Sequence, residues 1–76
     1  MFTKVASKNE RQSVWHAKTE VLDCHFLCST SIDHSEVMIF ECNKDGTVED
    51  WIEVYCDYTQ VFNHHDHMER YYKEIS

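Results

Sequence analysis

The chain has no proline and a single glycine, Gly46, among its 76 residues. Proline and glycine are the residues that most often mark turns and linkers, so nothing in the composition signals a boundary inside the chain. The sequence therefore predicts one domain over residues 1–76. Residues 1–12 are polar and basic apart from a few apolar positions, and we expect them to be loosely ordered.

Long apolar runs are missing as well. No stretch approaches the roughly 20 apolar residues that a transmembrane helix needs, and the first residues lack the apolar core of a secretory signal peptide. We therefore expect a cytoplasmic protein, in which the four cysteines are thiols unless a metal holds them. Apolar residues still make up 42% of the chain, enough to favour a folded core over disorder.

Positive charge is scarce where negative charge is dense. Between Glu20 and Glu69 the chain carries twelve acidic residues and one basic residue, Lys44, so the net charge of this stretch is −11. Such a surface repels nucleic acid and membranes, and it attracts basic protein surfaces. We expect the partner to be a basic protein surface, with no direct contact to nucleic acid or membrane.

The clearest predicted element is a β-hairpin. Two β-prone runs, 37–40 and 52–56, flank Asp45-Gly46, a dipeptide typical of tight turns because glycine takes positive φ without steric cost. A tight loop would place Met38 opposite Ile52, and Phe40 opposite Asp50. Met38, Phe40, Ile52 and Val54 would then share one face.

The last predicted element is a helix that begins after Asn63, a good N-cap residue, with Asp66 in its first turn. An apolar stripe at helical spacing would lie on the sheet. It consists of Met68, Tyr71, Tyr72 and Ile75.

Residues 13–28 allow two interpretations. Apolar residues recur at helical spacing, yet the stretch is rich in Val, Thr, Cys, Phe, Trp and His, which are poor helix formers. We favour a strand, because a two-stranded ribbon is marginal without a third. The predicted fold class is α+β, a three-stranded antiparallel meander followed by a C-terminal helix packed on the sheet.

The hairpin also carries a family resemblance. The pattern E-x-M-x-F-x-C-x-x-x-G-x-V-x-D-W-x-E, which begins at Glu36 and ends at Glu53, resembles a hairpin of small uncharacterised proteins of tailed bacteriophages and related viral genomes. With the histidine-containing helix that follows, the resemblance extends to about Tyr72. It implies a virus-encoded accessory protein and brings no catalytic residue with it.

Metal binding is one candidate chemistry. Cys24 and Cys28 have a spacing found in zinc sites, and His64 and His67 would share one face of a helix. If residues 24–28 form a strand, however, the two cysteines lie about 13 Å apart and cannot share one ion. We favour the cysteines as core residues and expect no cofactor. A small Cys/His metal-binding structural protein remains the alternative function.

Catalysis has no comparable support. Cys24 and His25 are adjacent in sequence, and neighbouring strand residues point to opposite faces, so they do not form a nucleophile–base pair. Acidic pairs such as Glu53 and Asp57 are expected to be a solvated stripe. We do not expect an enzyme.

An acidic and aromatic surface is the favoured site. If the helix covers the opposite face of the sheet, Trp51 and Tyr55 are exposed among carboxylates, a combination typical of interfaces that attract a basic partner. If the helix covers this face, the two rings belong to the core instead. The candidate partner-binding residues are Glu41, Glu49, Trp51, Glu53, Tyr55 and Asp57.

The favoured function is thus an acidic protein–protein interaction module. We expect a virus-encoded inhibitor that binds a basic, nucleic-acid-binding host protein in the host cytoplasm, with carboxylates in place of DNA phosphates. A homodimer joined through an exposed strand edge is a further option for so short a chain.

Overall fold

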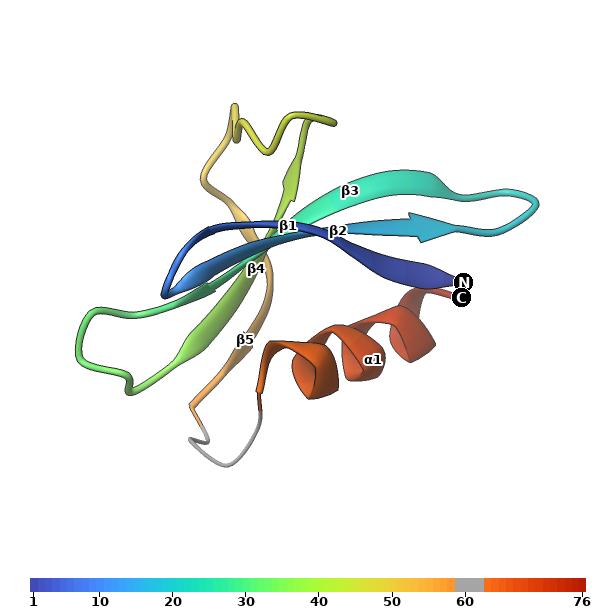
Figure 1. The fold of residues 1–76 in the computed structure, drawn as a ribbon. Helices are drawn as coiled ribbons and strands as arrows, with labels where there is room; N and C mark the ends of the chain where they lie inside the picture. The colour runs from blue at the N-terminus through green and yellow to red at the C-terminus, as the bar shows by residue number, and fades with distance from the viewer. Residues whose placement is uncertain (59–62) are drawn as a thin grey trace.

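A computed structural model describes residues 1–58 and 63–76 as one antiparallel sheet of five strands with a single helix across it (Figure 1). The strand order β1-β2-β3-β4-β5 follows the sequence, so each strand pairs with its neighbour in the chain. The prediction of three strands was wrong, although the class is still α+β. The elements are β1 (Phe2–Asn9), β2 (Gln12–Lys18), β3 (Asp23–Thr30), β4 (Val37–Cys42), β5 (Glu53–Asp57) and α1 (His64–Ile75).

The two extra strands come from the first thirty residues. The stretch 13–28 is extended, as the strand interpretation predicts, but a turn at residues 19–22 divides it into β2 and β3. Residues 1–12, expected to be loosely ordered, include the whole of β1, which forms one edge of the sheet.

Side chains rather than glycines shape the turns between these strands. The backbone N–H of Arg11 donates to Asn9 Oδ1 (2.9 Å) in the first turn, and that of Leu22 donates to Thr19 Oγ1 (3.0 Å) in the second. In the third, the backbone N–H of Ser35 donates to Asp33 Oδ1 (3.0 Å). Short polar side chains can replace a backbone partner in this way, so the turns form without the residues that usually announce them.

The larger core lies between the sheet and α1. Asn63 Oδ1 accepts the backbone N–H of Asp66 (3.0 Å), which confirms the predicted N-cap. Met68 and Tyr71 of the predicted stripe are buried against the sheet, with Tyr72 and Ile75 at the border. The sheet contributes Trp15, Ala17, Phe26, Cys28, Val37 and Ile39.

A smaller core lies on the opposite face of the sheet. Val14, Leu27 and Phe40 are buried there although no helix covers this side in the described chain. The segment 43–52, between β4 and β5, supplies part of the cover, because Val48 packs against this cluster. The sheet thus has two covered faces, one under α1 and one under this segment.

The predicted register of the β4–β5 hairpin was wrong. Met38 lies opposite Cys56 and Phe40 opposite Glu53, so residues 43–52 form a long connection in place of a tight loop. The Asp-Gly turn does form, at the tip of that connection, where the Gly46 N–H donates to the Asn43 carbonyl (2.9 Å). A local turn signal located the turn without locating the strand ends.

Gly46 anchors this connection to the sheet, and its replacement by alanine tests that contact. Gly46 has φ +87°, and a Cβ there would lie 2.9 Å from Val14 Cγ2. We expect Gly46→Ala to lower the free energy of unfolding by about 1–3 kcal/mol in urea denaturation, through backbone strain and the clash with β2. Lys44→Ala, an exposed position in the same turn, should change it by less than about 0.5 kcal/mol. Equal effects would show that the connection does not rest on β2.

Candidate functional site

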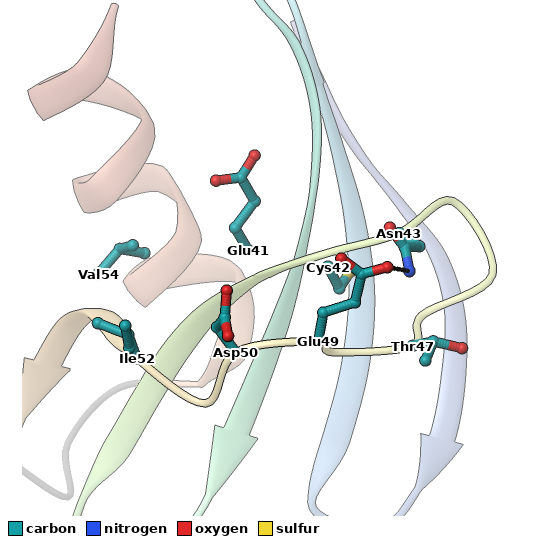
Figure 2. Close-up of a pocket in the computed structure, with 8 residues that line it drawn as sticks. All are labelled: Glu41, Cys42, Asn43, Thr47, Glu49, Asp50, Ile52 and Val54. Atoms are coloured by element: carbon teal, nitrogen blue, oxygen red, sulfur yellow. Dashed lines mark hydrogen bonds between the residues drawn. The ribbon is translucent and has the colours of Figure 1, made fainter.

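A pocket of about 400 Å³ opens where β4 and β5 separate (Figure 2). Pairing between the two strands runs as far as Phe40 and Glu53, and the next residues on either side diverge into the connection. The pocket is a consequence of the shifted register, since a tight hairpin would leave no space there. Its lining consists of Glu41, Cys42, Asn43, Thr47, Glu49, Asp50, Ile52 and Val54.

The pocket is acidic on one side and apolar on the other. Figure 2 shows Glu49 and Asp50 on the connection and Glu41 on the end of β4, with Ile52 and Val54 beside them. The Asn43 side-chain amide donates to Glu49 Oε1 (3.3 Å). Of the described residues, none that lines the pocket is basic, so its carboxylates are not neutralised from within.

The rim carries an unusual amount of exposed apolar surface. Trp51 is 62% exposed, Ile52 72% and Val54 41%, and the three are near neighbours in sequence. The Trp51 ring is nevertheless held, because it stands edge-on to Phe40 with 5.1 Å between ring centroids. Exposed aromatic and aliphatic groups of this kind are characteristic of binding surfaces when they cluster.

Four of the six predicted partner-binding residues lie at this end of the molecule. Glu41 and Glu49 line the pocket, while Trp51 and Glu53 belong to the segment that runs past it into β5. The predicted acidic and aromatic surface is therefore partly assembled.

The other two predicted residues, Tyr55 and Asp57, face α1 instead. The Tyr55 hydroxyl donates to Asp57 Oδ2 (3.2 Å), and Arg70 Nη1 of α1 donates to the same oxygen (3.1 Å). The helix thus covers the Tyr55 side of the sheet, whereas Trp51 leaves that side and is exposed. Each of the two sequence interpretations was right for one ring and wrong for the other.

Sequence reasoning missed six lining residues: Cys42, Asn43, Thr47, Asp50, Ile52 and Val54. The assumed tight hairpin turned Ile52 and Val54 inward by simple alternation. No local signal would have found them, because the turn at Gly46 does form and the length of the connection around it depends on the register of β4 and β5.

The pocket offers no activated nucleophile. Burial raises the pKa of the Cys42 thiol to about 11, so that side chain is neutral at physiological pH. Among the described residues that line the pocket, Cys42 alone has a sulfur or imidazole group. The chemistry that the pocket supports is the attraction of positive charge.

The four residues considered as candidate metal ligands do not converge in the described part of the chain. Burial raises the pKa of Cys28 to about 12, so this thiol is protonated at physiological pH. His64 binds two hydroxyls, with Nδ1 2.7 Å from Ser13 Oγ and Nε2 2.7 Å from Thr30 Oγ1, and His67 is buried against Tyr55. Across residues 1–58 and 63–76, no group of three or more His, Cys, Asp or Glu side chains is placed to hold a metal ion.

Comparison with known proteins adds no relative to this description. No protein family, curated protein or solved structure matches the chain. In the described part of the chain, no helix has the length and apolar character needed to cross a membrane.

Proposed function

We propose that this chain is an acidic protein-binding module that docks a basic protein surface through residues 49–54 and the adjoining pocket. One observation carries the proposal: three exposed apolar side chains border a pocket that is lined by three carboxylates and by no basic residue among those described. The proposal includes no catalytic role.

The two kinds of group would have different effects on binding. The carboxylates of Glu41, Glu49 and Asp50 steer a basic partner toward the pocket and raise the association rate. Trp51 and Ile52 lose water on contact and supply most of the affinity, as buried anchors do at other interfaces. Because Trp51 already rests on Phe40, little of its freedom remains to be lost on binding.

The pocket is suited to one long cationic side chain of the partner. Lysine and arginine have apolar stems and charged heads, so the stem would lie along Ile52 and Val54 while the head meets the carboxylates. This division of contacts gives specificity for a basic surface over a merely apolar one.

The acidic residues between Glu20 and Glu69 do not all belong to the surface around the pocket. Asp23 binds His16 (2.6 Å) and Lys18 (3.3 Å), Asp33 shapes the turn before β4, and Asp57 pairs with Arg70. Mimicry of DNA would therefore be local to the pocket. Following the bacteriophage resemblance, the proposed partner is a host nucleic-acid-binding protein in the host cytoplasm, with its nucleic-acid site as the surface bound.

Affinity capture from a bacterial lysate tests this function. The tagged chain is used at low salt and at about 0.5 M salt, where exposed charges are screened, and retained proteins are identified by mass spectrometry. We expect a basic protein that is released by salt. Its affinity, measured by calorimetry with the purified protein, should fall at least tenfold for Trp51→Ala and for Glu49→Lys/Asp50→Lys.

The matched control is Glu10→Lys/Glu20→Lys, which makes the same change in net charge at two exposed turns of the first three strands. Binding should persist in this variant. An equal loss of affinity in both charge variants would show that net charge alone, and not the pocket, determines binding. A capture that retains no basic protein would contradict the proposed function.

A further inference from the structure

We propose that the acidic pocket of one copy also binds the basic first strand of a second copy, so that the chain pairs with itself through two equivalent contacts. This inference rests on the proposed function, because it uses the same pocket. The group that would occupy the pocket is β1 of a second copy of this chain. Its basis is the distribution of charge and exposed apolar groups on β1.

β1 has the composition that the pocket requires. The strand is an edge of the sheet, and seven of its eight residues, from Thr3 to Asn9, are exposed. It carries Lys4 and Lys8 on either side of Val5, which is 54% exposed. Lys4 lies opposite Trp15 on the α1 side, and Lys8 lies beside Gly46 on the other side, so β1 offers a lysine toward each face of the sheet. Either lysine has the charge that the carboxylates of the pocket attract.

The charges of β1 and of the following turn are available to a partner. The described hydrogen bonds of Lys8 and Arg11 are with backbone carbonyls, those of Gly46 (3.3 Å) and Thr30 (3.0 Å), and the charge of Lys8 also acts on the nearby Asp45 carboxylate. Residues 1–18 contain four basic side chains and one acidic one, a net charge of +3, against −11 over residues 20–69. The first two strands and residues 20–69 therefore carry net charges of opposite sign.

The two surfaces are also close enough for a reciprocal contact. Lys8 reaches the tip of the connection that forms one wall of the pocket, since its Nζ donates to the Gly46 carbonyl. A two-fold axis near this tip would bring each pocket to the other copy's β1, so that both contacts form at once and close the dimer.

The edge formed by β1 is unsuited to backbone pairing with a strand of another copy. The pairing of β1 with β2 is irregular at two places, between Lys4 and Ala6 and between Ser7 and Asn9. Bulges and lysines on an edge prevent continuous sheet extension between copies. The contact we infer therefore depends on side chains, which makes it sensitive to charge and salt.

Charge reversal with mixing tests the pairing, with sedimentation velocity as the measurement. At low salt and high micromolar concentration the wild-type chain should sediment as a dimer, and at about 0.5 M salt as a monomer. Glu49→Lys/Asp50→Lys and Lys4→Glu/Lys8→Glu should each raise the dissociation constant at least tenfold. An equimolar mixture of the two variants should restore dimers, because each pocket again meets a strand of opposite charge.

Circular dichroism establishes that each variant is folded, and Glu10→Lys/Glu20→Lys, the matched control, should still dimerise. A wild-type chain that remains monomeric, an assembly that survives both reversals, or a mixture that stays monomeric would each overturn the pairing. None of these results bears on capture of a basic protein from lysate, so the proposed function and this inference can fail separately.

Discussion

Replacing Ile39 by alanine should lower the free energy of unfolding by about 3 kcal/mol. Ile39 is 0% exposed and lies in the core between the sheet and α1, with Val37 and Met68 in the same cluster. The substitution removes apolar contacts and leaves a cavity that the strand cannot close, because Ile39 is paired on both sides, with Cys28 and with Tyr55. In a domain of this size such a loss is a large part of the total stability.

Urea denaturation followed by tryptophan fluorescence measures the change. The matched control is Ile52→Ala, which deletes the same atoms from a side chain that is 72% exposed, and it should shift stability by less than about 0.5 kcal/mol. The two isoleucines thus separate the core from the proposed binding surface. Ile52→Ala should weaken capture of a basic partner without unfolding the chain, and comparable destabilisation by both substitutions would contradict the assigned core.

Replacing His64 by asparagine should cost about 2 kcal/mol near pH 7.5, and less in mild acid. His64 joins the start of α1 to two strands through Ser13 Oγ and Thr30 Oγ1, each at 2.7 Å. Trp15 Nε1 donates to the same Ser13 hydroxyl (2.8 Å), which in turn can donate to His64 Nδ1. This order of donors fits a neutral imidazole with its proton on Nε2.

The pH dependence follows from the same geometry. Burial, then the neighbouring His67 and Lys4, hold the pKa of His64 below its ordinary value. The unfolded chain therefore takes up this proton first as the pH falls, so the contribution of His64 is complete above the unfolded-state pKa of about 6.5 and is lost as the pH falls through the lower pKa of the folded state. The difference between wild type and His64→Asn should shrink over the same fall in pH.

Thermal and urea denaturation over this pH range measure the difference, with His34→Asn as control. His34 is exposed and has φ +60°, a conformation that asparagine also adopts readily, so the control removes a histidine without loss of structure. The control should keep the acid dependence of the wild type. A constant difference between wild type and His64→Asn from neutral pH to about pH 5 would contradict the titration of this ring.

Local sequence patterns were sufficient to predict α1 and to assign the side chains of β4 to the two faces of the sheet. Asn63 and Asp66 locate the start of the helix, and its apolar stripe lies on the sheet as the spacing predicts. Alternation along β4 correctly separates Val37 and Ile39 from Phe40. Capping and periodicity depend on residues within one or two turns of each other, so the sequence alone determines them.

The number of strands depended on contacts that local patterns do not show. Two turns form around Asn9 and Thr19, whose side chains bind the backbone where a glycine would otherwise announce a turn. With a single glycine in the chain, the only strong turn signal was at Gly46. β1 was missed because its extended form is stabilised mainly by pairing with β2, and Phe2 is its one residue packed against the larger core.

Which residues meet at the candidate site also depended on long-range contacts. Glu41, Glu49 and Trp51 were predicted as candidate binding residues from charge and aromatic character, which the sequence shows directly. Whether they converge depends on the register that places Phe40 opposite Glu53 and opens the pocket beyond that pair. Register is set by packing over the whole sheet, since Tyr55 must lie under α1 while Val48 covers the other face. The sequence alone determined the charge and apolar groups of the surface, and long-range packing decided which of them meet.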